Sequence, residues 1–147
     1  MSPAQQELAT LVLDSLVPGR DDLPGAGAIG VADYLDRAGG GSLTLRRTLT
    51  DALAAIEAAC HSKFTTPFAD LDGDQRTAVL QQVEADHGPL FTELLRRTYA
   101  GYYSDPAVLS ALGVDARPPQ PRGYTLTPFD PAILEGVKKR DRLYRDA

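Results

Sequence analysis

The sequence predicts an all-α fold: one compact domain of six to seven helices over residues 1–147. Three observations carry this prediction. Apolar residues recur at spacings of three and four, which places them on one face of a helix. Asp, or Asp followed by Pro, stands where several of these stripes begin, as expected of a helix start. The sequence offers no convincing pair of strands. A hydrophobic content of 43% in 147 residues is enough for one buried core.

The first half of the chain predicts three helices. The first ends at Pro18-Gly19, and the second ends in the glycines at 39–41. The third is the longest, because its stripe extends over about five turns of 3.6 residues. Their apolar stripes are, in chain order, Leu8, Leu11, Val12 and Leu16; Val31, Tyr34 and Leu35; and Leu45, Leu49, Leu53, Ile56, Cys60 and Phe64.

The second half predicts four further helices and an extended arm. Asp72 and Gln75 have the spacing of a capping box, and we expect the helix that they open to end near His87. A fifth helix follows directly, and Asp105-Pro106 starts a short sixth one. Four prolines in "VDARPPQPRGYTLTP" predict an extended, proline-rich arm over residues 114–129. Asp130-Pro131 then opens a C-terminal helix over residues 130–145.

One stretch imitates a dinucleotide-binding loop. "PGAGAIG", residues 24–30, satisfies G-x-G-x-x-G, and Asp51 lies where such a fold places its ribose-binding acid. That loop must follow a buried strand directly. Here a helical stripe and a polar segment precede it, and Leu45 and Leu49 continue in register into Leu53 and so begin a helix. We therefore predict a connecting loop that binds no nucleotide.

The other candidate sites also have simpler explanations. "DLDGDQRTAVLQ" resembles a calcium loop, but Gln75 replaces the glycine of its turn and Gln81 replaces its bidentate glutamate. Cys60 and His61 are adjacent, so on a helix they diverge by about 100° and cannot share a metal. Cys60 is predicted to be a core thiol and His87 to lie at a helix C-terminus. We predict no catalytic, cofactor-binding or metal-ligating residues, and no enzyme activity in this chain.

Net charge and hydropathy further limit the functions and locations that we expect. A net charge of −5 argues against a nucleic-acid surface. No segment approaches the roughly 20 apolar residues that span a bilayer, so we expect no direct membrane insertion. No twin-arginine pair precedes the first helix, which predicts a cytoplasmic protein. A periplasmic location is expected instead if such a signal was removed or if a partner carries one.

Binding features are concentrated near the C-terminus. Tyr99, Tyr102 and Tyr103 stand at i, i+3 and i+4 and form what we call the tyrosine ledge. Tyr99 and Tyr102 are equally compatible with core packing, in which a buried hydroxyl would have a partner. Tyrosine and arginine dominate binding hot spots, and an extended arm loses little entropy when it docks. The candidate interface residues are Tyr102, Tyr103, Asp105, Pro106, Arg117, Pro118, Pro119, Pro121, Arg122 and Tyr124.

Three blocks resemble a known family: "LVLDSLVPGRDDLPGAGAIGVADYLDRA", "TYAGYYSDPAVLSALG" and "RPPQPRGY". They are similar to the gluconate 2-dehydrogenase subunit 3 family, over roughly residues 8–125. The resemblance implies a small subunit without a cofactor that supports folding, stability and often export of a large subunit. It implies that this partner is an FAD-containing oxidoreductase of the glucose–methanol–choline (GMC) type, often joined by a cytochrome c subunit.

We therefore expect a non-catalytic accessory subunit that binds and stabilises, and helps to mature, a GMC-type sugar or polyol dehydrogenase or oxidase. Two alternatives stay open. One is a stand-alone helical module that binds a small apolar ligand, and the other is a small enzyme whose site the sequence does not reveal.

Overall fold

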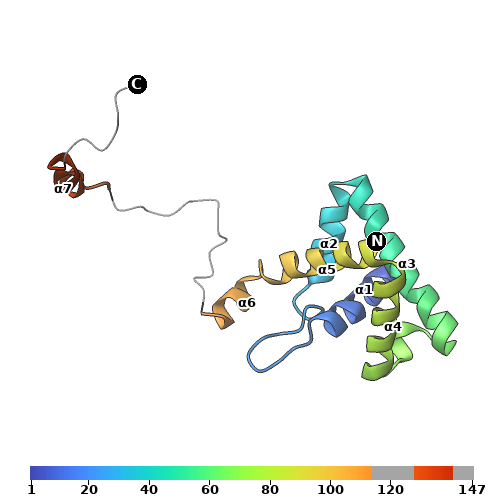
Figure 1. Ribbon diagram of the computed structural model, residues 1–147. Coiled ribbons are helices and arrows are strands. Elements are labelled where there is room, and N and C mark those ends of the chain that lie inside the picture. Colours follow the sequence, from blue (N-terminus) through green and yellow to red (C-terminus); the bar gives the residue numbers. More distant parts are fainter. Residues whose placement is uncertain (114–127, 141–147) are drawn as a thin grey trace.

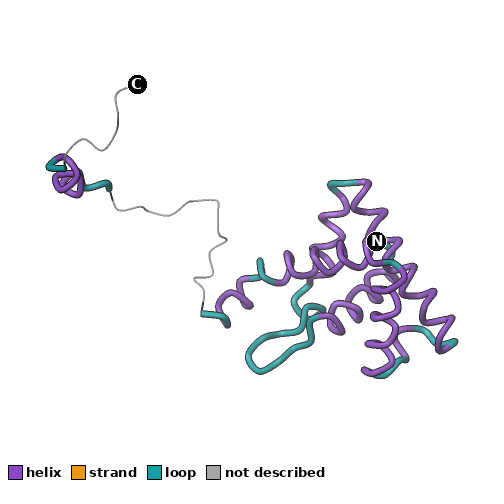
Figure 2. Tube along the Cα trace, in the orientation of Figure 1, coloured by secondary structure: helices purple, strands orange, loops and turns teal. Residues whose placement is uncertain are grey.

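The computed structural model describes residues 1–113 and 128–140, and within them it confirms the all-α prediction (Figure 2). These residues form seven α-helices and two 3-10 helices and contain no strand. The α-helices are α1 (Pro3–Leu16), α2 (Val31–Gly40), α3 (Leu43–Phe64), α4 (Gly73–Asp86), α5 (Gly88–Tyr102), α6 (Pro106–Ala111) and α7 (Glu135–Lys138). The 3-10 helices are η1 (Phe68–Asp70) and η2 (Pro131–Leu134). We call residues 1–113 the helical bundle and residues 128–140 the C-terminal segment.

The helical bundle is built around α3, which packs against α1, α2, α4 and α5 (Figure 1). The predicted stripe on α3 is largely confirmed: its members are buried from Leu45 to Cys60, and Phe64 is half-buried. Leu13 of α1 and Ile56 of α3 are fully buried. Burial of such side chains, at about 25 cal/mol per Å² of apolar surface, is the main force holding these helices together.

Helix starts agree with the predicted capping residues. Asp72 accepts a hydrogen bond from the backbone N–H of Gln75 at 2.8 Å, and the Gln75 amide oxygen accepts one from the Asp72 N–H at 3.0 Å. This is the predicted capping box, and it gives Asp72 a structural role in place of a calcium ligand. His87 is the C-cap of α4, also as predicted.

The glycines of "PGAGAIG" belong to the loop between α1 and α2, which crosses α1 closely. The Gly27 N–H donates to the Asp14 carboxylate at 2.8 Å. A Cβ at Gly27 would lie 2.6 Å from the Thr10 carbonyl oxygen, so only glycine fits there. Gly30 has φ +74° and is the N-cap of α2. Close packing and turn geometry therefore explain the glycines of this motif, and the preceding segment is a helix, as predicted.

The C-terminal segment begins at the second Asp-Pro pair. Asp130 caps η2 by accepting a hydrogen bond from the Ala132 N–H at 2.9 Å. The helix that follows ends at Lys138. Residues 114–127, which include most of the predicted arm, and residues 141–147, which include the end of the predicted 130–145 helix, lie outside the described residues. The predicted boundaries of the arm and the last helix therefore stay predictions.

Candidate partner interface

The tyrosine ledge lies at the C-terminal end of α5, where two of its three rings are exposed. Tyr99 is 43% exposed and Tyr103 is 52% exposed. Their ring centroids are 6.1 Å apart, so the two side chains form one continuous aromatic surface. Amphipathic rings of this kind supply contact area at low entropic cost, which is why tyrosine is enriched at interfaces. Tyr103 therefore remains a candidate contact residue, and Tyr99 joins it.

Tyr102 is the buried base of the ledge. Its side chain is 3% exposed, and its hydroxyl donates a hydrogen bond to the Pro24 carbonyl at 2.9 Å. Its ring meets that of Tyr103 edge-on, with centroids 5.2 Å apart. Burial raises the pKa of Tyr102, and the charges of Tyr103 and Asp105 raise it further. Tyr102 thus positions Tyr103 and ties α5 to the α1–α2 loop, and its buried ring leaves little surface for direct contact with a partner.

Gly101 explains how α5 comes so close to α2. A Cβ on Gly101 would lie 2.7 Å from Cδ1 of Tyr34 and 3.0 Å from Cγ1 of Val31. Both of these side chains belong to α2, so α2 already fills the space beside the glycine. The ledge therefore stands on a rigid contact between two helices. Preorganised contact surfaces lose less entropy when a partner binds.

Asp105 and Pro106 have a structural role that the sequence already indicated. Asp105 is the N-cap of α6, and its carboxylate accepts hydrogen bonds from the N–H groups of Ala107 at 2.8 Å and Val108 at 3.4 Å. Pro106 occupies the first turn of this helix and is exposed. Val108 is completely buried. This cap holds α6 beside the ledge.

Six of the ten predicted interface residues cannot be placed. They are Arg117, Pro118, Pro119, Pro121, Arg122 and Tyr124, which all lie outside the described residues. The C-cap of α6 is Leu112, whose apolar side chain is 46% exposed. The chain therefore passes from the ledge towards the predicted arm through an exposed apolar residue.

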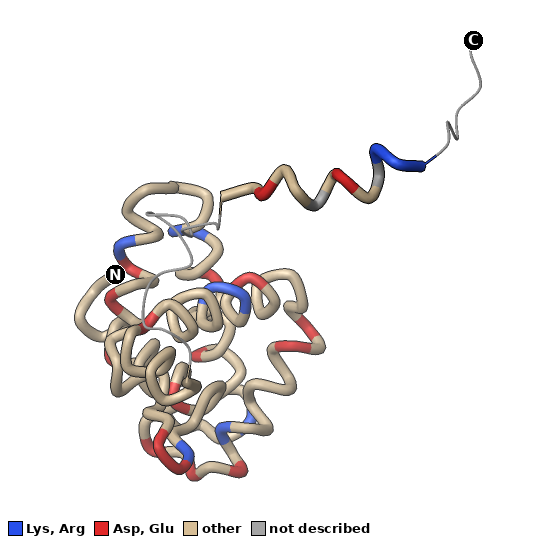
Figure 3. Tube along the Cα trace, turned by 90° about the vertical axis from the view of Figure 1, so that its left-hand side faces the viewer, with Lys and Arg blue, Asp and Glu red and all other residues tan. Residues whose placement is uncertain are grey.

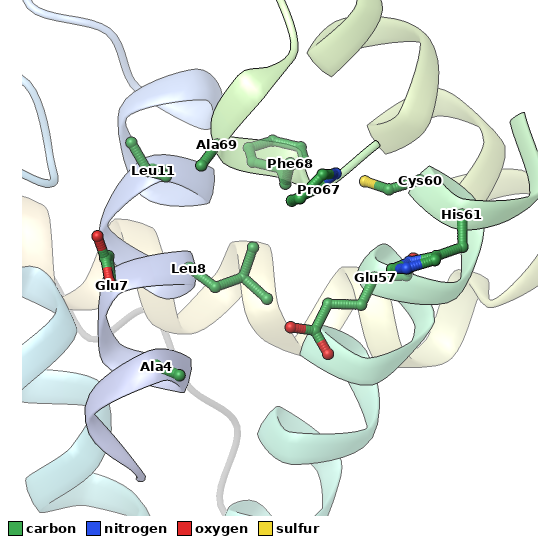
Figure 4. Close-up of a pocket in the computed structure, with 10 residues that line it drawn as sticks. All are labelled: Ala4, Glu7, Leu8, Leu11, Glu57, Cys60, His61, Pro67, Phe68 and Ala69. Atoms are coloured by element: carbon green, nitrogen blue, oxygen red, sulfur yellow. The ribbon is translucent and has the colours of Figure 1, made fainter. Parts of the chain in front are cut away.

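A separate feature that the sequence did not indicate is a pocket of about 160 Å³ between α1 and α3, closed at one end by η1 (Figure 4). Leu8 and Leu11 line one wall, Phe68 lies at the η1 end, and the Cys60 sulfur points towards Phe68. The Glu57 carboxylate projects between the two helices (Figure 4). We call this feature the α1–α3 pocket. An apolar cavity of about this size holds one benzene-sized group.

Two features shape that pocket. Arg76 of α4 holds η1 in place, because its guanidinium donates to the carbonyls of Phe68 at 3.2 Å and Ala69 at 2.8 Å. Thr65 turns the chain out of α3 with a left-handed φ of 57°, which is unusual for a β-branched residue. Periodicity could not reveal this turn because no glycine marks it.

Cys60 is buried, so its predicted place in the core is confirmed. Burial raises the pKa of its thiol, and the charge of Glu57 raises it further. A thiol with a raised pKa is a poor nucleophile at neutral pH.

Within residues 1–113 and 128–140, no group of three His, Cys, Asp or Glu side chains is arranged to hold a metal ion. In the same ranges, no helix is both long and apolar enough to span a membrane.

Comparison with known proteins identifies the family of this chain. A search of curated proteins and a search of solved structures returned no significant match. The family model described as "Gluconate 2-dehydrogenase subunit 3" matches residues 3–115. The match covers every helix of the helical bundle, including the ledge and its supporting loop, and agrees with the resemblance found in the sequence. The chain therefore belongs to the gluconate 2-dehydrogenase subunit 3 family.

Proposed function

We propose that this chain is a non-catalytic accessory subunit that binds and stabilises an FAD-containing large subunit of the GMC type. Membership in a family of dehydrogenase subunits supports an accessory role. The tyrosine ledge supports a binding role, because Tyr99 and Tyr103 are exposed there on a rigid support. In this proposal FAD and the redox chemistry reside in the partner, a sugar or polyol dehydrogenase or oxidase.

The proposed contact surface consists of the exposed ledge residues and the proline-rich arm. Tyr99 and Tyr103 present their rings, and Asp105 acts indirectly by capping α6. Arg117, Arg122 and Tyr124 are proposed to extend the contact along the arm. Aromatic anchors with arginines around them are typical of the few residues that carry most binding energy.

The proposal is tested by co-expressing this chain with a GMC-type flavoprotein from the same organism. We expect the two chains to elute together in gel filtration, and the flavoprotein to be less soluble or less stable when expressed alone. Replacing both ring residues, Tyr99→Ser and Tyr103→Ser, should weaken the complex while leaving the bundle folded. Independent elution of the two wild-type chains would contradict the proposal.

Two further expectations belong to the same proposal. A cytochrome c subunit is proposed to join the complex as an electron acceptor, and affinity purification of the assembled complex followed by haem staining tests this. The complex is proposed to be cytoplasmic unless a twin-arginine signal on either subunit directs export. Cell fractionation with antibody detection of this chain distinguishes the two locations.

The α1–α3 pocket supports a second candidate function, a stand-alone module for a small apolar ligand. Its walls are largely apolar and its volume is about 160 Å³, which is enough for a compact hydrocarbon group. A thermal-shift screen of small aromatic and alkyl compounds tests this alternative. It is supported if one compound stabilises the wild type but not a Leu8→Phe variant that fills the pocket, and it is rejected if none does.

A further inference from the structure

The α1–α3 pocket combines an apolar floor with an acidic rim. Leu8, Cys60 and Phe68 line it and are buried, so they form the floor. Glu7 of α1 and Glu57 of α3 line the same pocket and are exposed, so they form the rim. Figure 4 shows the Glu57 carboxylate between the two helices. A group that enters this pocket therefore meets apolar surface at its inner end and negative charge at its outer end.

Helical spacing explains how the rim and the floor come together. On α3, Glu57 precedes Cys60 by three positions and His61 by four, so these side chains lie on one face of the helix. Ala4 of α1 and Ala69 of η1 also line the pocket, and their small side chains leave its volume unfilled. The pocket is therefore a consequence of residue size and register, and a larger side chain at either alanine would narrow it.

Neighbouring cations do not neutralise the acidic rim. Among the described residues, no ion pair involves Glu7 or Glu57. Arg76 donates instead to two carbonyls of η1, and the Lys63 ammonium donates to the Ala78 carbonyl at 3.3 Å. The two rim carboxylates are therefore available to a cation from outside the chain.

Two larger hollows on the bundle lack this separation of apolar and acidic surface. One, of about 470 Å³, lies between α3 and α4 and is lined by both Lys63 and Asp86. The other, of about 440 Å³, lies between α3 and α5, and its Glu93 is paired with Arg97 at 2.9 Å. Both signs of charge line each hollow, so neither selects a ligand by charge. In the described structure, the α1–α3 pocket is lined by carboxylates but by no lysine or arginine.

We propose that the α1–α3 pocket binds a small organic cation with an apolar body, such as a benzylammonium or alkylammonium ion. The apolar body lies against Leu8 and Phe68, and the ammonium group lies beside Glu7 and Glu57. A volume of about 160 Å³ fits one benzene-sized group, and a few placed polar groups on apolar walls are typical of ligand sites. This inference rests on the second candidate function, the small-ligand module, and names the charge of its ligand.

The experiment is an NMR titration of the isotope-labelled, full-length chain with three probes of similar size: benzylammonium, neutral benzyl alcohol and anionic benzoate. Benzylammonium should shift the amide signals around Leu8, Cys60 and Phe68. It should bind about threefold more tightly than benzyl alcohol, because carboxylates near the surface attract a cation only modestly. Benzoate should bind more weakly than either.

A charge-removing variant and a matched control locate the source of this preference. Glu7→Gln/Glu57→Gln keeps the size of both side chains, and should bind benzylammonium and benzyl alcohol with affinities within about twofold of each other. Its affinity for benzyl alcohol should stay near the wild-type value, which verifies that the pocket is intact. Acidic residues occur on many helices of the bundle (Figure 3), so the control, Asp51→Asn/Glu84→Gln, removes the same charge at exposed sites outside the pocket. It should keep the wild-type preference.

The outcomes separate this inference from both candidate functions. Equal affinities of the wild type for benzylammonium and benzyl alcohol would overturn the inference and leave the apolar module standing. If no probe shifts the signals around the pocket, the module and the inference both fail. A preference for benzylammonium that Glu7→Gln/Glu57→Gln retains would also contradict the inference, because the rim would not be its source. The accessory role is tested separately, by co-elution with the flavoprotein.

Discussion

Residues 105 and 130 begin two regions with the same local sequence and different outcomes. Asp105-Pro106 and Asp130-Pro131 both supply an aspartate cap and a proline in the first turn. The cap hydrogen bonds are almost equal, 2.8 Å to Ala107 and 2.9 Å to Ala132. In the first case an α-helix follows, with Val108 completely buried in the bundle. In the second case a 3-10 turn follows, with Phe129 and Leu134 exposed. A cap can start a helix, but tertiary burial decides whether the helix becomes part of a fold.

The largest expected difference between the two regions lies in their apolar side chains. Leu13→Ala removes a fully buried side chain from the bundle, and we expect a loss of about 2–5 kcal/mol in the free energy of unfolding. Leu134→Ala, at a site that is 41% exposed, should change that free energy by less than about 0.5 kcal/mol. Urea denaturation followed by circular dichroism measures both. Similar losses for the two variants would mean that the segment is part of the cooperative fold.

Removal of the cap at Asp105 should likewise reduce stability more than removal of the cap at Asp130. Asp105→Ala is expected to cost about 0.5–2 kcal/mol of bundle stability, because α6 loses its N-cap while Val108 is packed in the core. Asp130→Ala should leave the unfolding transition unchanged. Asp105→Asn is the control, since asparagine caps nearly as well as aspartate. If Asp130→Ala lowered the melting temperature as much as Asp105→Ala, the comparison would be wrong.

The tyrosine ledge allows a finer test within the bundle. Tyr102→Phe removes the hydroxyl that donates to the Pro24 carbonyl and should cost about 0.5–1.5 kcal/mol. Tyr103→Phe removes a hydroxyl from an exposed ring and should have no measurable effect on stability. Thermal denaturation of both variants checks this order. A larger loss for Tyr103→Phe would contradict the assignment of Tyr102 as the buried base.

The smallest expected effect is a pH dependence carried by Glu93. Its carboxylate accepts hydrogen bonds from Arg96 and Arg97, which lower its pKa from 4.5 to about 2. A lowered pKa stabilises the folded state fully above about pH 4.5, and this contribution is lost as the pH falls towards about 2. Because the pair is near the surface, we expect at most about 1 kcal/mol.

Glu93→Gln should therefore reduce stability at pH 6 and have almost no effect at pH 2. Glu135→Gln, which removes the exposed pair with Lys138 in the C-terminal segment, should leave bundle stability unchanged at both values. Denaturation curves across this range measure both variants. A Glu93→Gln variant as stable as the wild type at pH 6 would show that the pair contributes nothing.

Much of the bundle could be predicted from local sequence, because the relevant signals are short-range. The stripe from Leu45 to Cys60, the capping box at Asp72 and the cap at Asp105 each depend on residues within one helix or one turn, and all are confirmed. The exclusion of a nucleotide loop rested on the helix before "PGAGAIG", which is α1.

The rest depends on how distant elements meet. Periodicity places both Tyr102 and Tyr103 in the ledge, but only the loop at Pro24 decides which of the two rings is buried. The α1–α3 pocket is formed by three elements and depends on the turn at Thr65, whose left-handed φ no local signal indicates. The close contact of Gly101 with Tyr34 also depends on how two helices pack, and no sequence motif indicates it.

Hydrogen–deuterium exchange of the full-length chain tests the central comparison most directly. Amides within the bundle should exchange slowly, because their helices are held by a buried core. Amides of residues 128–140 should exchange within seconds, because each of the two helices there has four residues and helices this short are marginal in water. Slow exchange of residues 128–140, on the timescale of the bundle, would contradict the account.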